Sequence, residues 1–526
     1  MSSTSGLLMI FLLSISFGLD ASSINWLSVW PSVAALIVIF VSKKTLPGLL
    51  LGSVIGASML SSGFIHFLEL LFIDHLFSLM TNRWNLSVIL FTLLLAGFAE
   101  LLERGGGFNA LINRVLNRTD KSPRSMQWCA FGLGMICFFD GLANSMLVGK
   151  TLAGPAEKQG VPREKIAYIV DSTSSSVACI ALISTWIAYQ LAMIQEGFSL
   201  AHVEMKISAF SLFIHSIPYN FYCWFTLILL GVSLLTQWHV GPMRFVKTRS
   251  LKGDKVSATS LAVETSLLAV WVPLLVLILS LFIGLYISGS EQLQWPTSIE
   301  ELSIAIGAAN AARVLVLSAI LSLFVACLMN HKPIRQQQEQ VYKVVVTGMR
   351  KICGSIAILL SAWLLSGIMK SLEAHVMLGE LLFQKIDLSW FPSLVFITGA
   401  ILSFSTGTSW GTMGLLMPLA IPIVLGFDDT AVNHYIAPVI AAVFSGAVFG
   451  DHCSPFSDTT IVASLSCGIE PFEHVKTQLP YALFASGMAL LCGFIPIGFG
   501  MHPGVLLLLG TGAFVLLISV HKRVVQ

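Results

Sequence analysis

The chain has 526 residues, of which 56% are hydrophobic and only 11% are charged, and its formal net charge is +2. Soluble domains carry roughly 25% charged residues, so this composition excludes an ordinary soluble protein. The nearly neutral charge gives no reason to expect a nucleic-acid partner. Long apolar runs alternate with short polar connections, and this pattern indicates membrane-spanning helices rather than the alternating strands of a barrel.

The N-terminal part predicts helices of two kinds. The first apolar run, residues 6–18, lacks a basic residue before it and an A-x-A site after it, so we expect a retained helix rather than a signal peptide. The run from His66 to Met80 contains Glu69, Asp74 and His75. We expect that run to lie along the membrane interface rather than to cross the bilayer.

Lys and Arg gather in particular connections, at 104–124, 150–165, 244–255 and 332–343. The positive-inside rule places these connections in the cytoplasm. The connections at 288–301 and 427–433 contain acidic residues but no Lys or Arg, so we expect them outside. The sequence therefore predicts a multi-pass protein of the inner (cytoplasmic) membrane with both termini in the cytoplasm.

Two apolar segments have flanks that do not suit a single crossing. Met126 to Gly149 has basic flanks on both sides, which predicts a re-entrant hairpin that enters from the cytoplasm. Trp390 to Gly426 has acidic flanks and, at about 35 residues, is too long for one straight span, so we expect a hairpin from outside. A long helix with polar residues at its middle follows each hairpin, at 166–195 and at 434–465. These two units predict an inverted repeat.

The predicted fold is therefore an all-α polytopic membrane protein, with about twelve transmembrane helices plus two re-entrant hairpins in an inverted-topology repeat. We divide the chain into N-terminal helices with the interfacial segment (1–84), a first repeat (85–260, hairpin 126–149), a second repeat (261–500, hairpin 390–426) and a C-terminal helix (501–526).

Hard oxygen ligands gather at the hairpin tips and at the centres of the two long helices. A carboxylate in a bilayer costs at least roughly 3 kcal/mol, so acids there indicate an ion or proton pathway. In Gly450 to Thr460, two acids and several hydroxyls surround Pro455, which opens the helix backbone. We predict a site for a cation and a proton, which compete for the same carboxylates. Its residues are Asp140, Asn144, Asp171, Thr173, Ser175, Thr406, Thr408, Ser409, Asp451, Ser454, Asp458 and Thr459, with Na⁺ at Asp451, Asp458 and Asp171.

Each of these residue types also has a structural interpretation. Small hydroxyl residues let helices pack closely, and we assign this role to Ser174, Ser176, Thr412 and Thr460. The acids could form buried ion pairs with Lys150, His434 or His452, and His452 is either a proton relay or a histidine facing water. Other charged residues we expect at the surface: Glu157, Arg163, Glu164 and Lys165 in a solvated loop and helix start, and Lys370, Glu373, His375 and Glu380 on the outer side.

A second motif favours a different chemistry. Gly407 to Gly411 matches G-x-S-x-G, the elbow that carries a serine nucleophile. That elbow needs a strand before the serine and a helix after it, but apolar membrane sequence lies on both sides here. An intramembrane serine protease, with His434 or His452 as its base, is the remote alternative.

The residues at the second helix break resemble a known family. Gly446 to Asp451, continuing to Thr460, is similar to a signature of the NhaC family of sodium/proton antiporters, within the larger ion-transporter superfamily. Gly407 to Thr412 looks like its second signature, and Ala143-Asn144 and 165–173 look like its larger members. The resemblance covers roughly residues 90–484. Where larger members carry a second acid and an aromatic residue, this chain has Gly141 and Leu142, so fewer acids line the first half.

The resemblance implies a secondary transporter, a Na⁺/H⁺ antiporter that exports cytoplasmic Na⁺ in exchange for H⁺. Some members are thought to move organic solutes, so a Na⁺-coupled transporter of a small carboxylate or amino acid is the alternative. The chain contains no G-x-x-x-x-G-K-[ST] loop, so an ion gradient should drive transport. We expect no enzymatic activity and no cofactor, with Na⁺ and H⁺ as transported ions. The expected partners are membrane lipids, the transported cation and, by analogy with the superfamily, a second copy in a homodimer.

Overall fold

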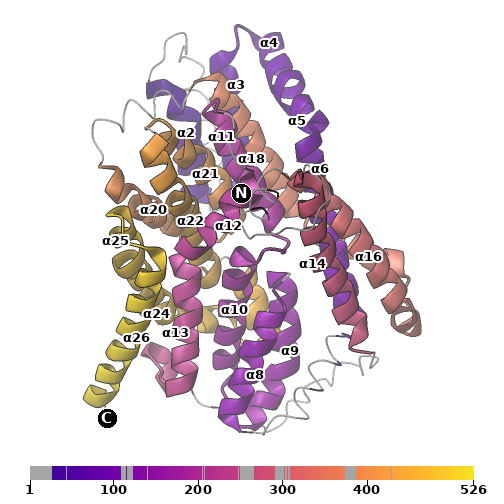
Figure 1. The fold of residues 1–526 in the computed structure, drawn as a ribbon, viewed down its shortest axis with the longest axis vertical. Coiled ribbons are helices and arrows are strands. Elements are labelled where there is room, and N and C mark those ends of the chain that lie inside the picture. The colour runs from indigo at the N-terminus through magenta and orange to yellow at the C-terminus, as the bar shows by residue number, and fades with distance from the viewer. Residues whose placement is uncertain are drawn as a thin grey trace.

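The computed structural model describes residues 26–42, 44–107, 110, 114, 122–138, 140–203, 205, 208–246, 248, 266–290, 301, 305, 309–373, 387–427, 429–455 and 457–525. Every regular element in these residues is a helix (Figure 1). The predicted first helix at 6–18 lies outside the described residues. The predicted all-α membrane fold is confirmed.

The N-terminal part, residues 26–104, is a series of helices joined by short connections. Its elements are η1 (Trp26–Val29), α2 (Trp30–Ser42), α3 (Thr45–Leu60), α4 (Phe64–Leu68), η2 (Glu69–Phe77), α5 (Ser78–Thr81) and α6 (Arg83–Arg104). The stretch Phe64–Thr81 is continuously helical, and it is long and apolar enough to cross a membrane. Its predicted position along the interface therefore stays a prediction.

The first predicted hairpin is present as two short helices, α8 (Pro123–Ile136) and α9 (Gly141–Lys158). Ser122 caps α8 by accepting a hydrogen bond from the backbone N–H of Ser125 at 3.2 Å. After α9 the chain forms α10 (Arg163–Ile180) and, beyond an irregular stretch at 181–186, α11 (Ile187–Leu200). The long polar helix predicted at 166–195 is thus a broken helix.

The second predicted hairpin consists of α20 (Phe391–Thr406) and α21 (Ser409–Leu425). Gly407 turns the chain between them with a φ of 68°, a conformation that favours glycine. Thr408 then caps α21 by accepting from the N–H of Gly411 at 3.2 Å. The helix that follows is also broken, into α22 (Asp429–Cys453) and α23 (Asp458–Cys467), and Pro455 lies in the break.

The two hairpin units pack against each other in a matching way. Helix α9 contacts α10 of its own unit and α23 of the other unit, while α21 contacts α22 of its own unit and α11 of the other. The open ends of α8 and α9 lie at the same end of the molecule as the C-terminus, whereas α20 and α21 open towards the opposite end (Figure 1). This arrangement is that of the predicted inverted pair.

The remaining helices surround these two units. They are α12 (Ala209–Ser216), η3 (Ile217–Tyr219), α13 (Phe221–Thr236), η4 (Gly241–Phe245), α14 (Leu268–Gly289), α16 (Ala311–Gln336), α17 (Val341–Lys351), α18 (Cys353–Ser371), η5 (Leu388–Trp390), α24 (Pro471–Ala489), η6 (Leu490–Phe494), α25 (Ile495–Gly498) and α26 (Pro503–Val525). In the part of the chain that the structure describes, ten helices are long and apolar enough to cross a membrane. The protein is therefore an integral membrane protein.

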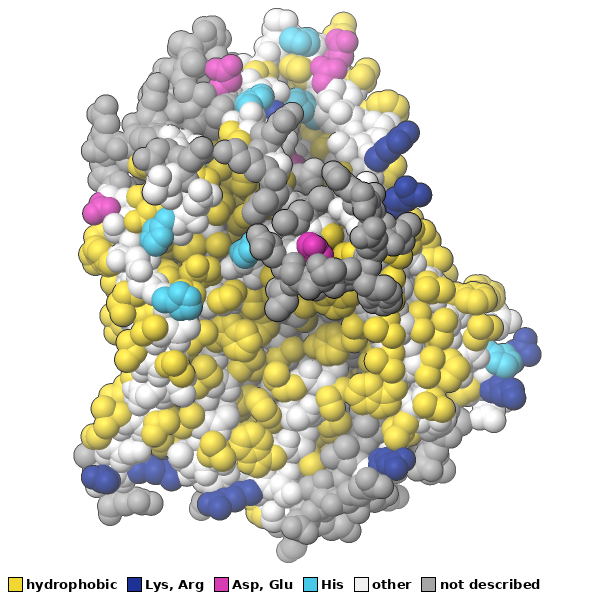
Figure 2. Space-filling model, viewed as in Figure 1, with side chains coloured by type: hydrophobic (Ala, Val, Ile, Leu, Met, Phe, Trp, Pro, Cys, Tyr) yellow, Lys and Arg dark blue, Asp and Glu magenta, His cyan; other side chains and the backbone are white. Residues whose placement is uncertain are grey.

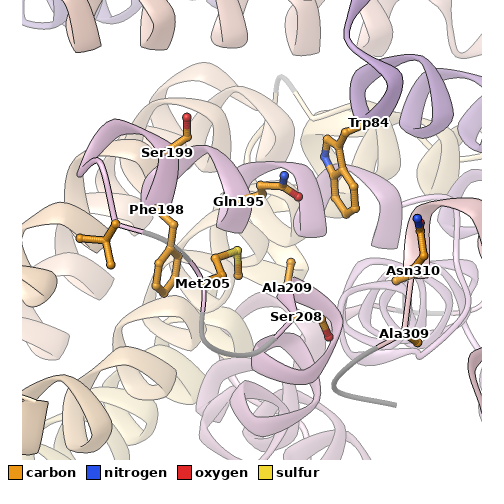
Figure 3. Close-up of a pocket in the computed structure, with 11 residues that line it drawn as sticks. Trp84, Gln195, Phe198, Ser199, Met205, Ser208, Ala209, Ala309 and Asn310 are labelled. Carbon is orange, nitrogen blue, oxygen red and sulfur yellow. The ribbon is translucent and has the colours of Figure 1, made fainter. Parts of the chain in front are cut away.

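Side-chain types and cavities distinguish the two ends of the molecule. Most of the Lys and Arg side chains visible in Figure 2 lie along its lower part, and Asp and Glu lie in its upper part. A cavity of about 660 Å³ opens in the upper part, between the start of α6, the end of α11 and the starts of α12 and α16 (Figure 3). The lower end is the one that the positive-inside rule predicts to be cytoplasmic.

Close backbone contact between α20 and α22 makes a testable prediction. A Cβ atom at Gly450 would lie 2.1 Å from the carbonyl carbon of Ser403. Because backbone cannot move away as a side chain can, we expect Gly450→Ala to destabilise the protein by about 1–3 kcal/mol. Thermal unfolding of the purified protein should show a lower Tm. Gly231→Ala on α13 is the control, because nothing lies within 4 Å of its added Cβ. Equal Tm values for the two variants would contradict this packing.

Candidate cation-binding site

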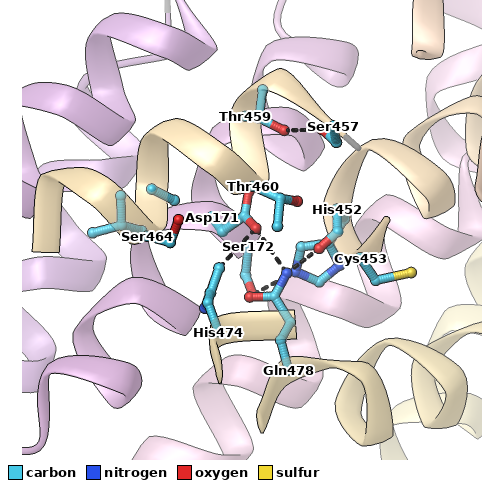
Figure 4. A network of polar contacts seen from close by, with 12 residues as sticks. Asp171, Ser172, His452, Cys453, Ser457, Thr459, Thr460, Ser464, His474 and Gln478 are labelled. Carbon is cyan, nitrogen blue, oxygen red and sulfur yellow. Dashed lines mark hydrogen bonds and ion pairs between the residues drawn. The ribbon is translucent and has the colours of Figure 1, made fainter. Parts of the chain in front are cut away.

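A buried network centres on Asp171 in α10, whose side chain has no exposed surface. Its Oδ2 accepts hydrogen bonds from His474 Nε2 at 3.1 Å and from Gln478 Nε2 at 2.8 Å (Figure 4). The same Gln478 amide donates to the backbone carbonyl of His452. Gln478 thereby ties α10, α22 and α24 together beside the break after Cys453.

His452 extends this network to α13. Its Nε2 lies 2.8 Å from Ser172 Oγ, and its Nδ1 lies 2.7 Å from the hydroxyl of Tyr222. Each hydroxyl can donate or accept, so the ring satisfies both nitrogens in either neutral tautomer. The side chain is only 1% exposed, so the alternative of a histidine facing water is wrong.

Asp451 lies in the last turn of α22, where the helix break frees backbone carbonyls from helical hydrogen bonding. Its carboxylate Oδ1 accepts from Ser457 Oγ at 2.9 Å. Its backbone carbonyl accepts from Thr459 Oγ1 and Thr460 Oγ1, both at 2.9 Å. Thr460 was predicted to serve helix packing, but its hydroxyl also donates a hydrogen bond to a carbonyl at the helix break.

Several buried oxygens near the breaks lack a hydrogen-bond partner among the described residues. They are Asp171 Oδ1, Asp451 Oδ2, Asn144 Oδ1 and the hydroxyl of Ser175. A buried acceptor without a partner costs about 1–3 kcal/mol, so such atoms need an explanation. Carboxylate, amide and hydroxyl oxygens are the ligands that hard cations prefer, and these atoms are of those types.

The first hairpin holds Asn144 in a fixed orientation. The Asn144 amide donates to the carbonyl of Gly134 at 3.0 Å and to the carbonyl of Thr173 at 3.1 Å. These bonds join α8, α9 and α10. A Cβ at Gly134 would lie 2.1 Å from Thr173 Oγ1, so only glycine permits this approach. The fixed amide leaves its oxygen free to accept.

The acids influence one another electrostatically without forming one cluster. Asp451 lies close enough to Asp171 and Asp458 for their charges to interact. Like charges in a buried site cannot both stay ionised unless a cation or a proton compensates them. Within the described ranges, no group of three or more His, Cys, Asp or Glu side chains could hold a metal ion. A cation here would need amide, hydroxyl or carbonyl oxygens beside a carboxylate.

The structure places the other predicted residues around this centre. Asp458 is exposed in the first turn of α23, and Asp140 is half-buried at the tip of the first hairpin. Ser454 Oγ donates to the carbonyl of Phe404 at 2.7 Å and so joins the break to α20. Backbone groups of their own helices engage the hydroxyls of Thr173, Thr406 and Thr408, while Ser409 is buried. A ligand role for all of these residues stays a prediction.

Sequence reasoning missed three members of the network: His474, Gln478 and Tyr222. The first two lie on α24 with Tyr481, at positions i, i+4 and i+7 of one helix face. That polar stripe in an apolar helix was a readable signal. His474 is the partner of Asp171, in place of the predicted partners Lys150, His434 and His452.

The prediction of a solvated helix start at Lys165 is wrong. Lys165 is 1% exposed, and its ammonium lies over the rings of Tyr168 and Tyr481 at 5.0 and 5.4 Å. Its nearest hydrogen-bond partner is Ser233 Oγ at 3.4 Å, and no described acid pairs with it. Helices α13 and α24 pack over this end of α10 and exclude water. Glu157 and Arg163 are mostly buried too and form an ion pair at 2.7 Å.

The G-x-S-x-G match has none of the geometry of a serine nucleophile. Helix α20, not a strand, precedes Ser409 in the structure. His452, one proposed base, directs its two ring nitrogens to Ser172 and Tyr222. The protease alternative therefore has no support from the fold.

The bridging role of Gln478 makes a second prediction. In Gln478→Leu, Asp171 and the carbonyl of His452 lose a donor inside the protein, which should cost about 1–3 kcal/mol per buried acceptor. We expect a clearly lower Tm in thermal unfolding of the purified protein. Gln336→Leu is the control, since Gln336 is exposed at the end of α16. An unchanged Tm in Gln478→Leu would show that the bridge does not hold these helices.

Lys165 makes a third prediction. A buried charge without an ion-pair partner is costly, and an apolar side chain of similar length removes that cost. We expect Lys165→Met to leave the Tm unchanged or to raise it, whereas Lys332→Met, at an exposed position, should have no effect. A large fall in Tm for Lys165→Met alone would mean that the cation stabilises the fold.

Comparison with known proteins identifies the family of the chain. The profile of the Na⁺/H⁺ antiporter family matches residues 177–498, more than half of the chain. A protein of Haemophilus influenzae whose function is uncharacterised is 28% identical over 490 residues, 91% of this chain and 92% of that protein.

Relatives with named activities match shorter parts. The Na⁺/H⁺ antiporter NhaC of Alkalihalophilus pseudofirmus is 32% identical over 133 residues, 24% of this chain and 25% of that protein. The malate-2H⁺/Na⁺-lactate antiporter of Bacillus subtilis is 31% identical over 153 residues, 28% of this chain and 29% of that protein.

A solved structure shares the fold. The YdaH transporter of Alcanivorax borkumensis, described as having an unusual topology, aligns with a TM-score of 0.60 at 16% sequence identity and covers 90% of this chain and 99% of that one. The chain thus shares the fold of the YdaH transporter. With the family profile and the resemblance to NhaC signatures, these findings show that the chain belongs to the Na⁺/H⁺ antiporter family.

Proposed function

We propose that this protein exchanges cytoplasmic Na⁺ for external H⁺, with both termini in the cytoplasm. The observation that carries the proposal is the pair of buried carboxylates, Asp171 and Asp451, each with one oxygen that has no partner among the described residues. Both lie where a broken helix meets the opposite repeat. Transporter sites are expected at such places.

The chemistry required is competition between two cations. Desolvation favours the protonated form of a buried carboxyl group, and a bound Na⁺ favours the ionised form. When Na⁺ leaves, a proton can replace it on the same oxygen, so the buried charge stays compensated. His474 and Gln478 hold Asp171 Oδ2 in place, which leaves Oδ1 for the exchanged ion.

The inverted pair gives this site access to both sides. Helix α9 of one hairpin contacts α23, and α21 of the other contacts α11, so each hairpin packs on half of a broken helix from the opposite repeat. A rocking of one repeat against the other would open the site to one side while closing the other. The hydroxyls of Thr408, at the tip of the second hairpin, and Ser454, in the second helix break, stay candidate ligands whose contacts with the ion form or break in this motion.

Transport by purified protein in liposomes tests the exchange. With a pH-sensitive dye inside and an imposed proton gradient, we expect Na⁺ to collapse the gradient for the unmodified protein. Asp451→Asn and Asp171→Asn should both abolish the response, because Asn keeps the shape and the hydrogen-bond acceptor but cannot carry a proton or compensate Na⁺. Asp387→Asn, at an exposed position, is the matched control.

The outcomes separate the site from the function. No Na⁺ response in the unmodified protein would contradict the exchange. A normal response in Asp451→Asn and Asp171→Asn would contradict the assignment of the site. We also predicted Asp458 as a carrier, and Asp458→Asn in the same assay shows whether an exposed acid at the start of α23 takes part.

A second candidate function is Na⁺-coupled transport of a small organic anion. The similarity to the malate-2H⁺/Na⁺-lactate antiporter supports it. The same carboxylates would then hold Na⁺ beside an organic carboxylate. If malate or lactate raises the Tm only when Na⁺ is present, and Na⁺ alone does not raise it, this function replaces simple exchange.

A further inference from the structure

A charged cavity lies apart from the carboxylate network, and nothing in the proposed exchange uses it. It has a volume of about 280 Å³ and lies between the ends of α11 and α18 and the starts of α6 and α5. Its charged or titratable lining residues are Asp74, His75, Glu196 and Lys370. None of the residues in the Asp171 network lines it.

Glu196 and Lys370 face this cavity without forming an ion pair. The Lys370 ammonium instead donates to Ser199 Oγ at 3.2 Å. Both side chains are only partly exposed. An acid and a lysine that share a partly buried cavity normally pair, because each charge loses hydration there. Here the two opposite charges interact across the cavity without direct contact.

Other lining groups add polar capacity. The indole N–H of Trp84 is buried and has no hydrogen-bond partner among the described residues. Gly367 keeps the cavity open, because a Cβ there would lie 3.2 Å from His75 Nδ1. An unpartnered donor in the same cavity as Lys370 suits a carboxylate, which accepts several hydrogen bonds at once.

The charges of the cavity select the class of ligand. A simple anion would meet the repulsion of Glu196 and Asp74, and a simple cation would meet that of Lys370. A zwitterion places an ammonium near the acids and a carboxylate near the lysine and Trp84, so each charge gains a partner. The volume lies just below the range of pockets for drug-sized molecules, which suits a small ligand.

The neighbouring cavity continues this site. The larger cavity of about 660 Å³ shares Trp84, Gln195 and Ser199 with the charged one (Figure 3). Away from these shared residues most of its lining side chains are apolar, among them Phe198 and Met205, and Ser208 and Asn310 are polar. We propose that the two cavities bind an α-amino acid with an apolar side chain, its charged groups between Glu196 and Lys370 and its side chain towards Phe198. This site does not depend on the proposed ion exchange.

Binding of leucine to the purified full-length protein tests the proposal. We expect radiolabelled leucine to bind, and N-acetyl-leucine and leucine methyl ester to compete at least about tenfold more weakly, because each lacks one charge. Glu196→Gln and Lys370→Gln should each weaken leucine binding at least about tenfold. Lys343→Gln, at an exposed position of α17, is the control and should bind normally.

Each outcome decides for or against the site. Absence of binding by leucine and phenylalanine, or normal binding in both Glu196→Gln and Lys370→Gln, would overturn the proposal. If N-acetyl-leucine bound as tightly as leucine, the ligand would be a carboxylate without an ammonium group, and the amino-acid proposal would be wrong. The control for folding is Na⁺/H⁺ exchange by Glu196→Gln and Lys370→Gln in liposomes. The exchange rate of both variants should equal that of the unmodified protein. A loss of leucine binding with normal exchange therefore concerns this site alone.

Discussion

The structure depends on the cost of placing a carboxylate where water is absent. Asp171 and Asp451 are almost entirely buried, and neither has a lysine or arginine as an ion-pair partner within the described ranges. Hydrogen bonds from His474, Gln478 and Ser457 compensate one oxygen of each carboxylate and leave the other free. The negative charge of each carboxylate must then be balanced by a cation or a proton that binds reversibly.

The helix breaks place polar backbone groups beside these buried carboxylates. A continuous helix satisfies all its carbonyls and offers none to an ion, whereas a break inside protein frees them without exposing them to lipid. In the second unit the break lies at Pro455, and the hydroxyls of Thr459 and Thr460 hold the freed carbonyl of Asp451. In the first unit the break at 181–186 forms without a proline. Helix α10 of the first unit contacts both α22 and α23, the two halves of the broken helix of the second unit.

The sequence was sufficient for features that a single segment encodes. The flanking charges predicted both hairpins, and Pro455 among acids and hydroxyls predicted the second break. It was insufficient where burial depends on distant segments. His474 and Asp171 are 303 positions apart, so their contact could not be read from either segment. Lys165 looked like a loop residue because its neighbours Glu157 and Arg163 are charged, yet α13 and α24 cover it. The alternative interpretation of the acids as ion pairs named Lys150, His434 and His452 as candidate partners and did not include His474, which contacts Asp171.

The central claim is that Na⁺ and H⁺ compete for the same buried oxygens. It is tested most directly by adding Na⁺ to purified protein in weakly buffered solution and measuring proton release alongside Na⁺ binding. The account predicts release of about one proton or more per bound Na⁺, and none from the double variant Asp171→Asn, Asp451→Asn. Na⁺ binding without proton release, or equal release from the double variant, would contradict it.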